Sequence, residues 1–167
     1  MDPKYTLSVV TENETSALLR LATCLARHRV EIESFTCAAG DQSDLYRHTV
    51  VVRAHPDRIR RAIKQIGACV GVLSVHYQSD GATVDREVAL YKLSVDASAV
   101  GNSLQKLVRS SRARILVAGQ DYVVVEKTGH GDEIQELFEN LEPFGVTEFV
   151  RSGRVMVTKS QPTSVAG

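Results

Sequence analysis

The amino-acid sequence predicts an α+β protein made of two tandem β-α-β-β-α-β units. The chain has 167 residues, which is enough for two small domains, and its 43% hydrophobic and 24% charged content is typical of globular proteins. Strand-like and helix-like segments follow one another in the same order in both halves, with one polar linker between them. The halves therefore predict a repeat of architecture, although their residues do not repeat.

The first unit is predicted to contain four strands and two helices. Runs rich in β-branched residues indicate strands, and apolar residues at helical spacing, such as Leu18, Leu21 and Leu25, indicate the first helix. Pro56 favours the start of the second helix, because its missing N–H needs no partner in a first helical turn. The predicted strands cover residues 5–11, 32–38, 45–53 and 69–77.

The second unit repeats this order. Leu104 and Val108 lie on one predicted helix face, and Ile134, Leu137 and Leu141 lie on the next. The predicted strands cover residues 87–95, 114–118, 122–127 and 146–150, and residues 154–158 extend the last of them.

These elements predict two domains. We expect a first domain over residues 1–79, a linker at 80–83, a second domain over 84–160 and a frayed tail at 161–167. Each domain is expected to be ferredoxin-like, with a four-stranded antiparallel sheet and two helices on one face. Because a sheet with open edges commonly pairs with another chain, we expect a homodimer.

Charge and hydropathy argue against several classes of protein. The 20 basic residues balance the 20 acidic ones, so we expect no basic surface for nucleic acid. No apolar run approaches the ~18 residues that a membrane-spanning helix needs, so no membrane segment is expected. The first residues, from Met1 to Lys4, lack the plan of a signal peptide, and a cytoplasmic location is therefore expected.

No arrangement of residues points to catalysis or to a metal. Cys24, Cys37 and Cys69 have no paired spacing, and the five histidines are scattered and expected at the surface or at helix ends. Carboxylates between Asp132 and Glu142 fit the solvated face of the last helix. We therefore expect no catalytic residues and no metal ligands, while an enzyme built on this fold stays an alternative.

The start of the first helix is the strongest candidate for a binding site. The N–H groups of a first helical turn carry partial positive charge, which suits a small carboxylate. Asn13, which precedes this helix, offers both a donor and an acceptor. A plain helix cap without a ligand explains the same residues, and both interpretations stay open on physical grounds.

Several separate blocks of sequence, in the right order, resemble the small regulatory subunit of acetolactate synthase (acetohydroxyacid synthase). Residues 12–20 (ENETSALLR) and 32–36 (IESFT) resemble the family's opening, which reads E-N-x-x-G-x-L-x-R and then N-I-E-S-L. In the second half, residues 86–92 (REVALYK) are similar to its R-E-[IV]-x-L-x-K. Three further blocks resemble the family at residues 126–130 (EKTGH), 142–146 (EPFGV) and 149–155 (FVRSGRV). The resemblance extends over roughly residues 4–160.

The resemblance implies an N-terminal ACT domain, which is an amino-acid-sensing module, and a C-terminal domain of similar plan. It also implies that the chain does not catalyse a reaction. The family's small subunit binds the catalytic subunit, raises its activity and confers feedback inhibition by a branched-chain amino acid, usually valine. No cofactor is expected on this chain. Thiamine diphosphate, Mg²⁺ and FAD are held by the catalytic subunit, which condenses 2-oxo acids to start valine, leucine and isoleucine synthesis.

In the family, the effector lies at the interface between two ACT domains. One chain contributes the loop between its first strand and first helix, which corresponds here to Asn13, Ser16 and Ala17. The other chain contributes the start of its second strand, which corresponds here to Glu31 and Ile32. The resemblance therefore implies an effector site made of these five residues, divided between two copies of the chain.

Ser16 and Glu31 depart from the family pattern, which has Gly and Asn at these positions. Gly lets a ligand approach the backbone closely, whereas Ser adds a side chain where a carboxylate should sit. An ionised Glu only accepts hydrogen bonds, and it attracts a ligand's ammonium group while repelling its carboxylate. Our hypothesis is that activation of the catalytic subunit survives and that sensitivity to valine is weak or lost.

The segment Arg151, Ser152, Gly153 and Arg154 is the candidate surface for the catalytic subunit. A glycine bend that lets the last strand continue explains the same residues equally well. The alternative function is a free-standing ACT-domain amino-acid sensor, which would bind a ligand as a dimer without this enzyme partner.

Overall fold

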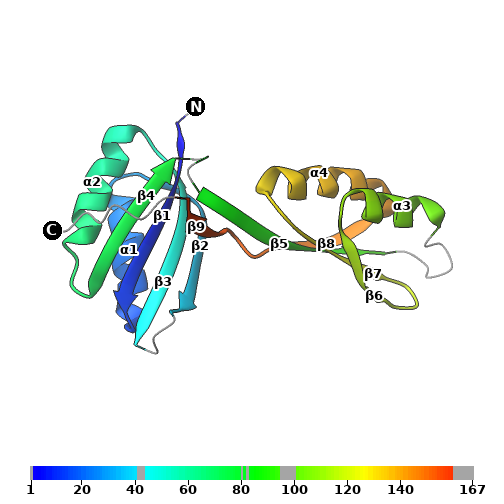
Figure 1. The fold of residues 1–167 in the computed structure, drawn as a ribbon, viewed down its shortest axis with the longest axis horizontal. Helices are drawn as coiled ribbons and strands as arrows, with labels where there is room; N and C mark the ends of the chain where they lie inside the picture. Colours follow the sequence, from blue (N-terminus) through cyan, green and yellow to red (C-terminus); the bar gives the residue numbers. More distant parts are fainter. Residues whose placement is uncertain (1, 41–43, 80, 82, 95–100, 160–167) are drawn as a thin grey trace. The chain divides into compact units, whose positions relative to one another are not determined.

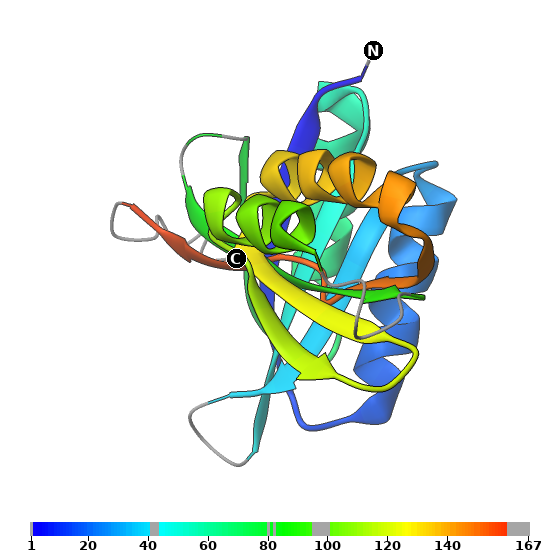
Figure 2. The same ribbon diagram turned by 90° about the vertical axis from the view of Figure 1, so that its right-hand side faces the viewer.

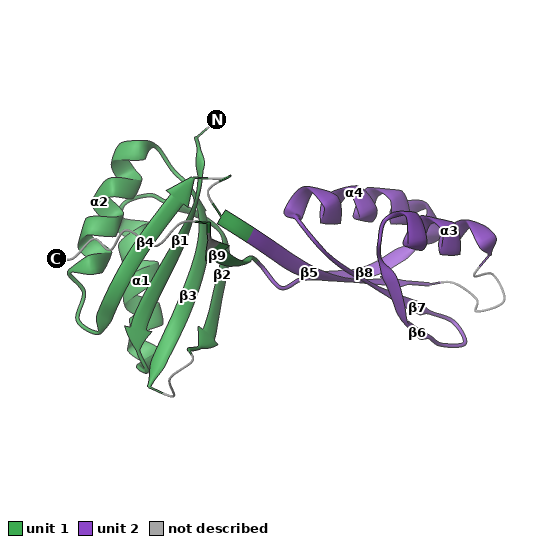
Figure 3. Ribbon diagram, viewed as in Figure 1, with its two compact units in different colours: residues 1–84, 154–167 green, residues 85–153 purple. Residues whose placement is uncertain are grey.

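The computed structural model describes residues 2–40, 44–79, 81, 83–94 and 101–159, which form two compact units (Figure 3). The first unit comprises residues 1–84 together with residues 154–167, and the second comprises residues 85–153. Among the described residues, no helix is both long and apolar enough to cross a membrane. The predicted α+β class and the twofold repeat are confirmed.

The first unit is a four-stranded antiparallel sheet in the order β2-β3-β1-β4, with both helices on one face (Figure 1). Side chains from the sheet and from both helices form one core, because the strands alternate apolar residues toward the helices. The elements are β1 (Lys4–Glu12), α1 (Thr15–Arg27), β2 (Glu31–Ala39), β3 (Leu45–Arg53), α2 (Pro56–Gly67) and β4 (Val72–Ser79).

The second unit has the sheet order β6-β7-β5-β8, again antiparallel, and Figure 2 shows α3 and α4 on the same face of it. A last strand, β9, pairs with β5. The elements are β5 (Thr83–Leu93), α3 (Asn102–Ser110), β6 (Arg114–Ala118), β7 (Val123–Gly129), α4 (Gly131–Leu141), the 3-10 helix η2 (Glu142–Phe144), β8 (Val146–Arg151) and β9 (Val155–Thr158).

Tyr91 is at the centre of the second core. Its side chain is fully buried, its ring stacks on Phe149 with 5.0 Å between centroids, and its hydroxyl donates to the carbonyl of Ile134 at 2.8 Å. Burial raises the pKa of Tyr91 to about 12. The hydroxyl therefore ties β5 to the first turn of α4 as a neutral donor.

Two strands begin more than two residues away from the predicted position. The strand predicted over residues 69–77 begins only at Val72, because Cys69 N–H still donates to the carbonyl of Ile66 at the end of α2 and Gly71 turns the chain with φ at +80°. Thr83, assigned to the linker, is the first residue of β5 and is buried. Within the predicted linker, positions 80 and 82 lie outside the described residues.

The last strand continues as predicted after the glycine bend, because β9 pairs with β5, the strand that also pairs with β8. By its contacts, however, the segment from residue 154 onward groups with the first unit. Two contacts of Arg154 explain this grouping: its guanidinium donates to Thr6 Oγ1 at 2.8 Å, and its carbonyl accepts from Thr36 Oγ1 at 3.2 Å. The tail predicted at 161–167 lies outside the described residues.

Candidate functional site

The loop between β1 and α1 is anchored by backbone hydrogen bonds. Asn13 N–H donates to the carbonyl of Asp44 at 2.9 Å, and Glu12 N–H donates to the carbonyl of Gly71 at 2.9 Å. The side chains of Asn13 and Ser16 are exposed on this loop. Two of the residues implied for effector binding are thus held on a fixed backbone and are open to solvent.

The carboxylate of Glu14 lies beside Ser16 on this loop. Ser16 Oγ and one guanidinium nitrogen of Arg20 both donate to Glu14 Oε2, each at 2.9 Å. The hydrogen bond from Arg20, and then that from Ser16, lowers the pKa of the Glu14 carboxyl. Glu14 occupies the N-cap position of α1 but makes no side-chain bond to the helix amides.

Ser16, one of the two residues that depart from the family pattern, therefore lies against the ion pair of Glu14 and Arg20. The motif pattern around Ser16 does not by itself predict this role of Arg20. Its position four residues after Ser16 does indicate that the two side chains are neighbours on the helix.

Ala17 is placed differently from its loop neighbours. Its side chain is 2% exposed and packs inward, and its N–H donates to the carbonyl of Glu14 at 2.9 Å. Ala17 thus fixes the position of α1, and its side chain does not line the loop surface.

Glu31 and Ile32 form the exposed start of β2, which is an edge strand of its sheet. The two cations nearby in the sheet, Lys4 and Arg53, both form ion pairs with Glu33. The outer edge of β2 is not paired in this sheet, and such an edge is available to another strand.

A single copy of the chain does not bring the two halves of the implied site together. Glu31 pairs with Arg53, which in turn pairs with Lys4 at the first residue of β1, whereas Asn13 follows the last residue of β1. At about 3.3 Å per residue, the nine residues of β1 separate these sheet ends by roughly 26 Å. A site that uses both groups therefore needs two copies.

The segment from Arg151 to Arg154 is extensively bonded within its own chain. Arg151 makes a double hydrogen bond to Glu87 Oε2 at 2.6 and 3.0 Å. Ser152 exchanges hydrogen bonds with the backbone of Val88, accepting at Oγ (3.0 Å) and donating from its N–H (2.9 Å). Gly153 has φ at +78°, which favours glycine.

The predicted glycine bend is therefore present. Contact of this segment with a catalytic subunit stays a prediction. It concerns chiefly the exposed Ser152 and the half-exposed Arg151, because Arg154 is 8% exposed.

Histidine placement corrects one expectation. His48, expected at the surface or at a helix end, is 2% exposed within β3. Desolvation by this burial lowers its pKa. Over the ranges that the structure describes, no group of three or more His, Cys, Asp and Glu side chains could hold a metal ion.

The two four-stranded, helix-covered units define a protein of the tandem ACT-like class. The solved small subunit of acetolactate synthase from Thermotoga maritima shares this fold with a TM-score of 0.82, at 23% identity, over 95% of this chain and 98% of that one. A family model described as the small subunit of acetolactate synthase matches residues 86–160.

Curated relatives extend the match to nearly the whole chain. A protein of Mycobacterium bovis named acetolactate synthase small subunit is 32% identical over 160 residues, which cover 95% of each chain. A protein of the same name from Mycolicibacterium smegmatis is 30% identical over 94% of this chain and 92% of its own length. The chain belongs to the acetolactate synthase small-subunit family.

Proposed function

We propose that this chain is the regulatory, non-catalytic subunit of an acetolactate synthase. It binds the catalytic subunit, which holds thiamine diphosphate, Mg²⁺ and FAD, and raises its activity. One observation carries the proposal: relatives named as small subunits align with the chain over almost their full length and over both units.

The proposed regulatory form is a homodimer with two equivalent effector sites. In one chain, the loop around Asn13 and the start of β2 at Glu31 lie at opposite ends of the sheet. A twofold axis places the loop of each copy against the strand start of the other, because a symmetric interface repeats each contact twice. The open edge of β2 supports this arrangement.

The proposed effector is a branched-chain amino acid, with valine as the first candidate, and its binding is weakened at two positions. Ser16 brings the Glu14 carboxylate to the helix start, where the carboxylate of an amino acid would sit. Glu31 adds a second carboxylate from the other copy. Because Arg20 already pairs with Glu14, the repulsion acts mainly at Glu31, where two like charges at 4 Å repel by about 1 kcal/mol in water, or roughly fivefold in affinity.

A valine titration of the reconstituted enzyme tests this proposal. We expect acetolactate formation to rise when the chain is added to its catalytic subunit, and to stay high as valine increases through the millimolar range. Full inhibition by millimolar valine would contradict the weakened site while leaving the subunit role intact.

Substitutions toward the family pattern sharpen the test. The double variant Ser16→Gly with Glu31→Asn is expected to gain inhibition by valine, and each single variant is expected to gain part of it. Glu139→Asn removes an exposed carboxylate from α4 and is the matched control. Inhibition gained by the control, or by none of the variants, would show that these two residues do not set the response.

A further inference from the structure

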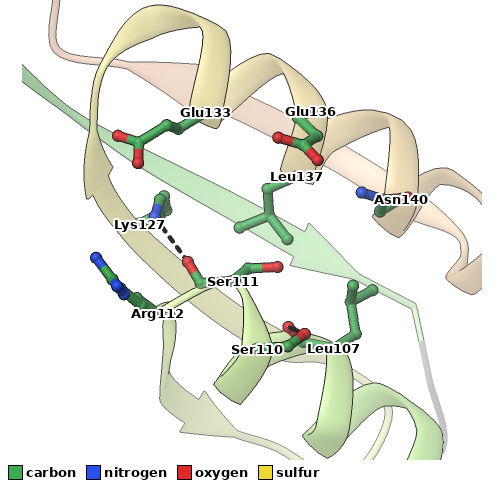
Figure 4. Close-up of a pocket in the computed structure, with 9 residues that line it drawn as sticks. All are labelled: Leu107, Ser110, Ser111, Arg112, Lys127, Glu133, Glu136, Leu137 and Asn140. Atoms are coloured by element: carbon green, nitrogen blue, oxygen red, sulfur yellow. Dashed lines mark hydrogen bonds between the residues drawn. The ribbon is translucent and has the colours of Figure 1, made fainter.

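A pocket of about 520 Å³ lies in the second unit, between the end of α3, the helix α4 and the strand β7 (Figure 4). This volume lies within the usual range for small-molecule sites. Leu107 and Leu137 supply its apolar part. Polar and charged side chains supply most of the rest: Ser111, Arg112, Lys127, Glu133, Glu136 and Asn140.

Matching features at the helix ends relate positions in the first unit to positions in the second. His55 is the N-cap of α2 and His130 is the N-cap of α4. Arg29 and Arg112 follow the ends of α1 and α3, and both have φ at 53°. These features pair Arg29 with Arg112 and His55 with His130, and neighbouring residues are compared by counting from them.

The first unit closes the corresponding gap with a side-chain bridge. His28, just before Arg29, shares a hydrogen bond of 2.7 Å with Gln65, ten residues after the N-cap of α2. The aligned residues of the second unit are Ser111 and Asn140, whose side chains are shorter. The second unit therefore has a pocket at the place where the first unit has the hydrogen bond between His28 and Gln65.

The pocket is lined by a buried lysine, Lys127, at a position where the first unit has an apolar core residue. Val52, three residues before the N-cap of α2, is fully buried, and the aligned residue of the second unit is Lys127. Lys127 is 5% exposed, and its Nζ donates to the carbonyl of Ser111 at 2.6 Å. An ammonium group has three donors, and a buried charge needs partners of opposite charge or polarity.

Glu133 is held beside this cation by the start of α4. Its carboxylate accepts from His130 N–H at 2.7 Å, and this bond is the largest cause that lowers the Glu133 pKa, with a further contribution from Lys127. A side chain at Gly129 would lie 2.6 Å from Glu133 Oε2 and 3.1 Å from Lys127 Cε. Glycine at this position therefore leaves room for both side chains to lie close to the strand.

We propose that this pocket binds a free α-amino acid with a polar side chain. Lys127 and Arg112 lie at one end of the pocket together with Glu133, and because their two positive charges exceed its single negative charge, this end receives the carboxylate of the ligand (Figure 4). Glu136 and Asn140 project from α4 toward the other end and accept from its ammonium group. The lining has charges of both signs, which matches a zwitterion better than a simple anion. This site is separate from the proposed valine site and does not depend on it.

Amide chemical shifts of the isotope-labelled full chain test the proposal. We add the polar protein amino acids one at a time, at millimolar concentration, and expect at least one to shift amides in residues 107–112 and 133–140 in a saturable way. For the tightest ligand, analogues that lack only the amino group or only the carboxylate are expected to bind about tenfold more weakly, because each loses a charge-assisted hydrogen bond. The proposal is overturned if no polar amino acid shifts these amides, or if the analogue without the amino group binds equally well.

Matched variants place the ligand in this pocket. Arg112→Asn and Glu136→Gln are each expected to weaken binding about tenfold, and Asn tolerates the positive φ of position 112. The controls are Arg29→Asn, at the aligned position of the first unit, and Glu139→Gln, three residues further along α4. Equal weakening by the controls would contradict the assignment.

A pocket-closing variant gives an independent check. Ser111→His with Asn140→Gln introduces into the second unit the pair that bridges the helices of the first. We expect this variant to unfold at the same temperature as the parent or higher, and to lose the ligand-induced shifts. A folded variant that still binds the amino acid would overturn the proposal.

Discussion

Lowering the pH is expected to destabilise the first unit through His48. Thr11 Oγ1 donates to the carbonyl of Glu12 at 2.9 Å and therefore has to accept from His48 Nε2, also at 2.9 Å. This pattern assigns the ring proton to Nε2. His48 Nδ1 is buried and has no hydrogen-bond partner in the described part of the chain. A proton added at Nδ1 would thus be a buried charge without an acceptor.

The size and sign of the effect follow from linkage. Because burial lowers the His48 pKa below its usual value of 6.5, the unfolded chain binds this proton more readily than the folded chain does. The contribution of neutral His48 to stability is complete above about pH 6.5. It falls by up to ~1.4 kcal/mol per pH unit until the pH passes the lower pKa of the folded protein. Between about pH 7.5 and about pH 5.5 we expect a loss of at most about 1.4 kcal/mol from this residue.

Urea unfolding of the parent and of His48→Gln measures this loss. Gln retains a donor for Thr11 but cannot titrate, so the free energy of unfolding of this variant should fall less than that of the parent over the same pH range, by at most about 1.4 kcal/mol. His55→Asn is the control, because it removes an exposed histidine while keeping a good N-cap residue. Equal pH dependence in the parent and in His48→Gln would refute the reasoning.

Three further substitutions test the packing of both units by chemical unfolding. Leu25→Ala should lower the free energy of unfolding by about 3 kcal/mol, because Leu25 is fully buried and its loss leaves a cavity. Gly145→Ala should cost about 1 kcal/mol or more, because Gly145 has φ at +80°, where a Cβ is strained. Glu87→Gln should cost about 1–3 kcal/mol, because it removes the carboxylate that Arg151 binds twice at a position 7% exposed.

Each of these predictions has a matched control. Leu19→Ala, at a position 70% exposed, and Glu148→Gln, whose side chain is 63% exposed, should each change stability by less than about 0.5 kcal/mol. Gly67→Ala lies at the end of α2 without a positive φ and should not destabilise. Controls as destabilising as their test variants would show that burial and φ do not explain the losses.

Local pattern was sufficient to predict most of the fold, because each helix and strand has an apolar face of the right period. Leu21 and Leu25 of α1 and the apolar stripe of α4 are buried as their spacing predicts, whereas Leu18, on the same predicted face, is 40% exposed. The alternation of β3 also indicates that His48 is buried, because it lies two residues before Val50 on the face toward the helices. Lys127 gives a similar signal, because it follows Val123 and Val125 at the same strand period.

Long-range contacts account for what local pattern could not show. The grouping of Arg154 with the first unit depends on Thr6 and Thr36, which are far from it in sequence. The position of Asn13 and Glu31 at opposite sheet ends depends on strand register, which a single sequence does not specify. The second copy that the proposed effector site needs follows from that register.

The most direct test of the central claim is the turnover of the catalytic subunit as purified chain is added in increasing amounts. We predict that acetolactate formation rises and then saturates as the two subunits form a complex, while the chain alone forms no acetolactate. Unchanged turnover at saturating chain would contradict the regulatory role and favour a free-standing amino-acid sensor. Acetolactate formed from pyruvate by the isolated chain would instead show that it is an enzyme in its own right.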